Sequence, residues 1–328
     1  MKITIYGAGA VGGLIAAKLA QHDNDNQISI IARGRTLEAI REYGLRVEDQ
    51  TGICHVMLAA DDEPSRVGVQ DIVILVVKAT ALADVATRIT PLIGPETIVV
   101  TAMNGVPWWF FENSDGPHSG LRLQSLDPDG VLADALPARQ IIGCVVHLSS
   151  NSPAPGLIRP GFGNRLILGE AIAGQPARLT CLVGLLAAAG FDTEASTDIR
   201  RDIWYKLWGN MTMNPLSAIT GASADKVLDD PLVRDFCLKA MEEAAAIGNQ
   251  VGCHIVQSGE ERMRLTRQLG AFKTSMLQDA EAGRALEIDA LVGAVREIGL
   301  HVGVATPSID ALLGLVRLYG RSHALYPQ

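Results

Sequence analysis

Residues 2–13 read KITIYGAGAVGG, and this stretch decides the fold. Lys2–Tyr6 is a short β-favouring run, and Val11–Gln21 carries the apolar periodicity of a helix. The glycines between them follow the spacing GxGxxG. In this context such glycines allow a tight turn, let a pyrophosphate approach the backbone, and let the helix pack closely on the strand. The alternative is a glycine-rich turn without a ligand. The stretch predicts a dinucleotide-binding turn that contains Gly7, Gly9, Ala10, Val11 and Gly12.

The first half of the chain alternates strand and helix patterns beyond this turn. Continuous apolar runs without strict alternation are typical of parallel strands covered on both faces. Repeated strand–helix units imply right-handed crossovers and a doubly wound sheet. We expect strands at Gln27–Ala32, Asp71–Val77, Thr97–Thr101, Ile141–Leu148 and Arg165–Leu168, with a short one near Phe191. Helices are expected at Thr36–Tyr43, Leu82–Ile89 and Ala177–Ala189, and prolines and glycines between residues 153 and 163 indicate loops.

The second half is predicted to be helical throughout. The patterns indicate helices at Asp198–Thr220, Pro231–Val251, Gly259–Leu269, Ser275–Ala282, Ile288–Ile298 and Pro307–Leu318. The fold class is therefore α/β, with an N-terminal Rossmann-type doubly wound parallel sheet followed by an all-α domain. We place the cofactor-binding domain at residues 1–195 and the helical substrate domain at residues 196–328. Residues 112–140 are expected to form a surface excursion with a short helix at Val131–Leu136.

Composition excludes several classes of function. The 328 residues carry a formal net charge of −8, which disfavours nucleic acid and anionic membranes as partners. Five irregularly spaced cysteines are typical of reduced, buried thiols, and the seven histidines show no metal-binding spacing, so no metal is expected. No uncharged apolar run reaches 18 residues, and glycines interrupt the apolar N-terminal run, which disfavours a signal peptide. We therefore predict a cytoplasmic protein.

The residue after the second strand indicates the choice of cofactor. An NAD enzyme would place Asp or Glu there to hold the ribose 2′-hydroxyl. Arg33 stands at this position, and its planar guanidinium can bind a 2′-phosphate; the alternative is a solvated surface arginine. Lys78, at the end of the third strand, either adds charge near the same phosphate or is only an exposed strand-end residue. The prediction is NADP(H).

A catalytic group is predicted on the helix at residues 198–220. Lys206, Asn210 and Asn214 are four residues apart and share one face. Apolar neighbours indicate that this helix is buried, and a buried lysine needs a partner or a role. Its ammonium can act as a general acid when hydride reaches a carbonyl carbon. Glu287 is the best carboxylate to orient it, although spacing alone does not establish the pair.

Two further residues are candidates for the same site. Asn104 follows the strand Thr97–Thr101 and would lie near the nicotinamide and the substrate, or would simply form an Asn-Gly turn. Ser275 begins a helix that it can cap, and capping does not exclude a ligand contact.

These segments together resemble the ketopantoate reductase (2-dehydropantoate 2-reductase) family over nearly the whole chain. The resemblance rests on GAGAVGG from residue 7, IARG from 31, ILVVK from 74, the Asn104-Gly105 turn, WYKLWGNMTMNPLSAITG from 204 and TSMLQDAEAGRALEID from 274. It implies NADPH-dependent reduction of a 2-keto acid to a 2-hydroxy acid. It also implies Lys206 as the general acid, Glu287 as the group that positions it or contacts ligand hydroxyls, and substrate contacts from Asn104, Asn210, Asn214 and Ser275. Arg33 and Lys78 would hold the 2′-phosphate.

The chain departs from the family pattern around the expected substrate. Met103 replaces the usual glutamine before the Asn-Gly pair, Val106–Trp109 is bulky, and residues 112–140 look longer than the family norm. The substrate is therefore expected to be ketopantoate or, as the alternative, another branched 2-keto acid. A catalytically silent NADP-binding sensor is a further alternative. The expected partner is a small-molecule keto acid, and a homodimer remains open.

Overall fold

The computed structural model describes residues 1–22, 25–112, 118–172 and 176–328. Contacts divide the chain into two compact units. Unit 1 comprises residues 1–103 and 130–199, and unit 2 comprises residues 104–129 and 200–328. The boundary that the sequence predicts at 195/196 lies four residues before the third crossing between the units, at 199/200. Residues 104–129, which we had placed in the first domain, belong to the helical unit.

Unit 1 is built on one ten-stranded sheet, in which nine strands follow the order β4-β3-β9-β8-β7-β6-β1-β2-β5 and β10 pairs with β9. Six consecutive strands, from β8 to β5 in this order, are mutually parallel. This parallel core confirms the predicted Rossmann-type fold. The strands are β1 Lys2–Tyr6, β2 Gln27–Ile31, β3 Leu45–Asp49, β4 Gly52–Val56, β5 Ala59–Asp61, β6 Ile72–Leu75, β7 Ile98–Thr101, β8 Ile141–Ala154, β9 Leu157–Glu170 and β10 Asp192–Ala195.

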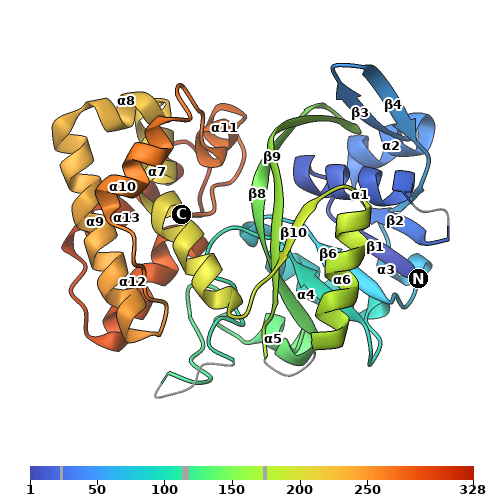
Figure 1. Ribbon diagram of the computed structural model, residues 1–328, viewed down its shortest axis with the longest axis horizontal. Coiled ribbons are helices and arrows are strands. Elements are labelled where there is room, and N and C mark those ends of the chain that lie inside the picture. Colours follow the sequence, from blue (N-terminus) through green and yellow to red (C-terminus); the bar gives the residue numbers. More distant parts are fainter. Residues whose placement is uncertain (23–24, 113–117, 173–175) are drawn as a thin grey trace. The chain divides into compact units, whose positions relative to one another are not determined.

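The sheet is longer and more mixed than the sequence predicts. The segments rich in proline and glycine within residues 153–163 are strand rather than loop, apart from the turn between β8 and β9. These two strands pair in antiparallel fashion as the long green ribbons of Figure 1, and irregular register between His147 and Ala154 accommodates the unusual residues. The hairpin β3–β4 and strand β5 were not predicted at all.

Helix α1 (Ala10–His22) is the centre of unit 1. It contacts β1 and β2 on one part of the sheet and β3, β4, β8 and β9 on the other, so the sheet curls around it. Its apolar side chains join Ile3, Ile5 and Ile30, all fully buried, in one core. The remaining helical segments of this unit are α2 Gly34–Tyr43, α3 Pro64–Val67, η1 Ala79–Ala81, α4 Leu82–Arg88, η2 Thr90–Leu92, α5 Val131–Ala135, η3 Ala138–Gln140 and α6 Pro176–Ala188.

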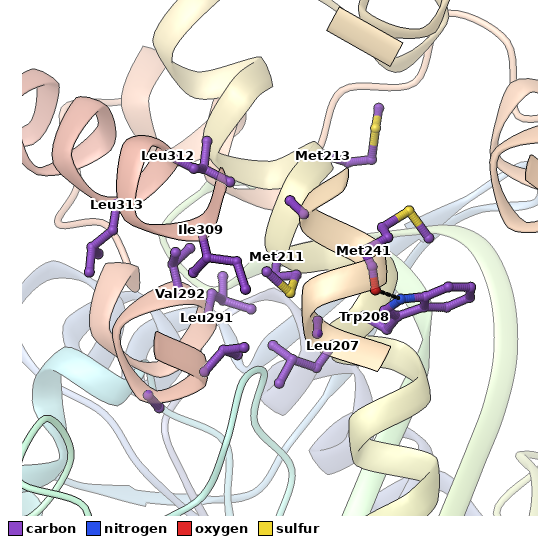
Figure 2. Packing of buried hydrophobic residues seen from close by; sticks show 14 of the residues in the cluster. Leu207, Trp208, Met211, Met213, Met241, Leu291, Val292, Ile309, Leu312 and Leu313 are labelled. Carbon is purple, nitrogen blue, oxygen red and sulfur yellow. Dashed lines mark hydrogen bonds between the residues drawn. The ribbon is translucent and has the colours of Figure 1, made fainter. Parts of the chain in front are cut away.

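Unit 2 is helical, as predicted, and has its own core around α7 (Ile199–Thr220). Trp204, Leu207, Trp208 and Met211 are at most 3% exposed, which confirms that this helix is buried. Figure 2 shows Trp208 donating its indole N–H to the Met241 carbonyl at 2.8 Å among these packed side chains. The other helical segments are α8 Ala224–Asp229, α9 Pro231–Gln250, α10 Gly259–Arg267, α11 Ser275–Glu281, the π-helical turn η4 Asp289–Gly293, α12 Ala294–Val302 and α13 Pro307–Ser322.

Two expectations about the surface are wrong in part. Residues 113–117 lie outside the described residues, but the rest of the 112–140 excursion is not simply on the surface. Leu123 is 2% exposed, and the Glu297 carboxylate accepts the amides of Gln124 and Ser125 at 2.6 and 2.8 Å. All five cysteines are free, but Cys54 and Cys181 are exposed rather than buried.

Among the described helices, none is both long and apolar enough to cross a membrane.

Candidate active site

The glycine-rich turn has the backbone geometry that the sequence predicts. Gly7 has φ +116°, and a Cβ there would lie 2.4 Å from the Val76 carbonyl oxygen. A Cβ on Gly12 would lie 2.1 Å from the Gly7 oxygen, so helix and strand approach too closely for a side chain. A Cβ on Gly9 would have no neighbouring atom within 4 Å, so there is open space beside the backbone at this position. The first helical hydrogen bond runs from Gly13 N–H to Gly9 O, so the amides of Ala10, Val11 and Gly12 form the helix N-terminus that suits phosphate.

Arg33 lies two residues after the end of β2, at the N-terminus of α2, and it has a partner that the sequence did not indicate. Its guanidinium is paired with the carboxylate of Asp84, in the first turn of α4. This hydrogen bond raises the pKa of Arg33 above its ordinary value. Burial raises the pKa of the nearby Tyr6 hydroxyl, and the positive charge of Arg33 partly offsets that effect. Lys78 lies three residues beyond β6, immediately before η1, and is half-buried.

In unit 2, the structure brings Lys206 and Asn104 together although they are 102 residues apart. Lys206 Nζ donates to Asn104 Oδ1 at 2.8 Å, and both side chains are half-buried. The amide oxygen accepts from the ammonium and keeps it pointed at the Asn104 turn. This contact supports a shared site, while the orienting role of Glu287 stays a prediction.

The Asn104-Gly105 turn is fixed against the segment that follows Glu287. Gly105 has φ +85°, and a Cβ there would lie 2.5 Å from the Ala290 carbonyl oxygen. The same oxygen accepts the Val106 amide at 2.9 Å. Ala290 is in the π-helical turn η4, a type of distortion often found at functional sites. Glu287, 9% exposed, is two residues before this turn, so the fold brings the backbone segments of Asn104 and Glu287 together.

The amide face of α7 continues from Lys206 toward α11. Asn214 is 5% exposed, and its Nδ2 donates to Ser275 Oγ at 3.4 Å. The expected cap is wrong by one residue, because Thr274 rather than Ser275 caps α11 and accepts the Leu277 amide at 3.2 Å. The Ser275 hydroxyl is thereby directed to Asn214. Asn210 is half-buried between Lys206 and Asn214 along the helix.

Several contributors to these sites could not be found from sequence. Asp84 lies 51 residues from Arg33, and no local pattern distinguishes it from any acidic residue in a first helical turn. Ala290 contributes through its backbone carbonyl, so its side chain gives no indication of this contact in the sequence. A separate cavity of about 640 Å³ in unit 2, lined by residues of α8, α9 and α10, contains none of the predicted site residues.

A glycine-rich turn at the carboxyl edge of a Rossmann sheet, together with a lysine held by an amide in a helical unit, defines the class of nicotinamide-dependent oxidoreductases. Family models agree with this assignment. Residues 3–172 match ketopantoate reductase PanE/ApbA, and residues 198–320 match its C-terminal region. The chain belongs to the ketopantoate reductase family.

Individual relatives cover almost the entire chain. A 2-dehydropantoate 2-reductase of Mesorhizobium japonicum is 44% identical over 97% of both chains. A crystal structure from Ralstonia solanacearum, described as a candidate ketopantoate reductase, is 55% identical with a TM-score of 0.94 and covers 99% of both chains. D-mandelate dehydrogenase, solved with NADH, shares the fold at 24% identity with a TM-score of 0.85, covering 99% of this chain and 100% of that one.

Proposed function

We propose that this protein catalyses the NADPH-dependent reduction of 2-dehydropantoate (ketopantoate) to pantoate, a step of pantothenate biosynthesis, in the cytoplasm. The family and the 44% identical 2-dehydropantoate 2-reductase support the reaction. The single observation that carries the proposal is the Lys206–Asn104 contact of 2.8 Å, because it fixes a proton donor on the polar face of a largely buried helix.

The residues of unit 1 fit the cofactor. The open space at Gly9 and the amides of the first turn of α1 suit the pyrophosphate, and Arg33 and Lys78 supply positive charge for the 2′-phosphate. When bound, NADPH supplies the hydride that adds to the carbonyl carbon of the keto acid. Every other requirement of the reaction falls on the side chains of unit 2.

Lys206 has the role of general acid. An ammonium donates up to three hydrogen bonds, and Asn104 accepts one of them. Another N–H is then directed at the keto oxygen, stabilises the negative charge that develops there, and transfers the proton that completes the hydroxyl group. Asn104 prevents the ammonium from turning away and thereby orients the proton.

Substrate binding is assigned to the polar residues along and beside α7. Asn210, Asn214 and Ser275 offer amide and hydroxyl donors that suit a carboxylate, and Asn104 borders the same face. Glu287 positions Lys206 or accepts from a substrate hydroxyl. Ketopantoate has such a hydroxyl, whereas pyruvate and 2-ketoisovalerate do not, so Glu287 would favour ketopantoate over both.

The choice of cofactor is tested at Arg33. Arg33→Asp places a carboxylate where the 2′-phosphate is expected, so it should weaken NADPH binding far more than NADH binding. Fluorescence titration with each cofactor measures this difference. Equal losses for both cofactors would remove Arg33 from the 2′-phosphate site.

The reaction is tested by following NADPH oxidation with ketopantoate, pyruvate and 2-ketoisovalerate. We compare wild type, Lys206→Ala and Lys226→Ala, the last being an exposed lysine of α8 that serves as the matched control. The expected result is ketopantoate turnover that falls about 10²- to 10⁴-fold only in Lys206→Ala.

The other outcomes separate the alternatives. Lysine-dependent turnover of a different branched keto acid would favour a paralogous reductase, for which the bulky Val106–Trp109 segment is the motivating observation. NADPH binding without any turnover would favour the sensor. A homodimer stays an open expectation, which light scattering of the full chain tests.

A further inference from the structure

Arg33 faces a carboxylate at the position where the proposed function places a phosphate. Asp84 contacts Nη2 of the guanidinium, and the two side chains are 50% and 51% exposed. Arg88 also acts on the nearby Tyr6, but its guanidinium pairs with Glu63 at 3.5 Å and donates to the Asp62 carbonyl at 2.7 Å. Asp84 is therefore the acidic partner of the guanidinium that is expected to hold the 2′-phosphate.

We propose that Asp84 is a specificity-determining residue that lowers the preference for NADP(H) over NAD(H) by competing with the 2′-phosphate for Arg33. The inference rests on the proposed cofactor site. A phosphate that takes the guanidinium fork must either displace Asp84, which breaks the existing ion pair, or bind next to it, which brings two anions close together.

The same carboxylate acts in the opposite direction on a cofactor without that phosphate. A ribose 2′-hydroxyl can donate to a carboxylate, which is how Asp or Glu selects NAD in other Rossmann proteins. Arg33 therefore favours the phosphorylated cofactor, and Asp84 opposes this preference. The sequence shows only Arg33 after β2, whereas the fold supplies the carboxylate from α4.

A different role for Asp84 predicts the reverse effect. If Asp84 served only to hold Arg33 ready for phosphate, removing its charge would weaken phosphate binding. Both partners of the Arg33–Asp84 ion pair are half exposed, so the pair orders the Arg33 side chain only weakly. The repulsion between the Asp84 carboxylate and a phosphate, in contrast, increases with the charge of the phosphate. We therefore expect repulsion to dominate.

The test measures the binding of 2′,5′-ADP and ADP to the full chain by isothermal titration calorimetry. The variants are Asp84→Asn, which keeps shape and removes charge, and Asp229→Asn, a control that neutralises an exposed partner of Arg267. Asp84→Asn should tighten 2′,5′-ADP binding about three- to tenfold and leave ADP binding unchanged or weaker. Because a phosphate monoester gains its second charge near pH 6, the gain should shrink at pH 5.5, and it should also shrink in high salt.

The possible failures are distinguishable. If Asp84→Asn binds 2′,5′-ADP no more tightly than wild type, and Arg33→Ala still weakens that binding, the proposed role of Asp84 is overturned. The NADP(H) assignment then stays in place. If wild type binds neither ligand, or binds both equally with no dependence on Arg33, the proposed cofactor site is overturned together with the inference.

Discussion

At the residue scale, three glycines in one turn perform different physical tasks. Gly7 adopts a left-handed backbone, Gly12 sits against the Gly7 oxygen, and Gly9 borders open space. The GxGxxG spacing already predicts a separate task for each of them. The structure separates the glycines that the fold requires from the one that only a ligand would require.

This separation gives a paired prediction. Gly12→Ala should lower the free energy of unfolding by about 1–3 kcal/mol or more, because its methyl group meets rigid backbone. Gly9→Ala should leave that free energy unchanged or raise it by up to about 1 kcal/mol, while NADPH affinity falls at least about tenfold. Urea unfolding and cofactor titration of both variants measure these effects. Equal destabilisation by both substitutions would contradict the assignment of Gly9 to the ligand.

At the element scale, residues 317–326 fix the π-helical turn η4 and the segment just before it, which contains Glu287. The Leu286 amide donates to the Leu325 carbonyl at 3.0 Å, and the Tyr326 hydroxyl donates to both oxygens of Asp289 at 2.8 and 2.9 Å. Arg317 Nη2 donates to Asp289 at 3.0 Å. The π-helical turn and its contact with the Asn104 segment therefore depend on residues at the far end of the chain.

Tyr326→Phe should lower the free energy of unfolding by about 1–2 kcal/mol, because a hydrogen bond to a charged carboxylate is lost. Burial first, and then the Asp289 carboxylate, raise the pKa of Tyr326, so its contribution is complete below the unfolded tyrosine pKa of about 10 and is lost as the pH rises above it. Denaturant titrations at pH 8 and pH 10.5 check both statements. Tyr319→Phe in α13, whose ring stacks on His323, is the control and should cost less. A difference between wild type and Tyr326→Phe that grows above pH 10 would contradict the assignment.

A second element-scale prediction concerns the packing of α7 on α9. Trp208 is 3% exposed, and its N–H bonds the Met241 carbonyl (Figure 2). Trp208→Phe leaves a void and removes the indole hydrogen bond to the Met241 carbonyl, so we expect a loss of about 2–4 kcal/mol of unfolding free energy. Thermal denaturation checks the loss, and a cost below about 1 kcal/mol would show that the site relaxes around the smaller ring.

At the scale of the whole molecule, each unit has its own hydrophobic core and its own buried cysteines. Cys144 belongs to the core of unit 1, and Cys237 and Cys253 belong to that of unit 2. Burial raises the pKa of the Cys237 thiol to about 12, so the reactive thiolate is absent at neutral pH. Cysteine labelling can therefore report on the opening of each unit separately.

At pH 8 a thiol reagent should modify Cys54 and Cys181 quickly and the three buried cysteines only after opening. The folded pKa of Cys237 lies above the unfolded value of about 8.5, so its contribution to stability is complete below that pH and decreases as the pH rises toward about 12. Timed labelling followed by peptide mass spectrometry provides the measurement. Rapid labelling of Cys237 in the native protein would contradict its burial.

Local sequence patterns were sufficient to predict the structural elements that depend mainly on neighbouring residues. The GAGAVGG turn, the parallel strands around it and nearly every helix of the second half follow from periodicity and from capping residues within a few positions. The strands at residues 45–61 were not predicted because most of their side chains are exposed or half-exposed and they lack a continuous apolar run. The prolines and glycines of β8 and β9 indicated loops locally, yet pairing between the two strands outweighed that preference.

Contacts between side chains that are far apart in the sequence became known only from the three-dimensional fold. Lys206 and Asn104, Arg33 and Asp84, and Tyr326 and Asp289 are separated by 102, 51 and 37 residues. The sequence predicts Ser275 as the cap of α11, whereas in the fold Thr274 is the cap and the Ser275 hydroxyl accepts from Asn214. Short-range hydrogen bonding and apolar periodicity determine helices and strands. Contacts between distant residues depend in addition on which faces of these elements pack against one another.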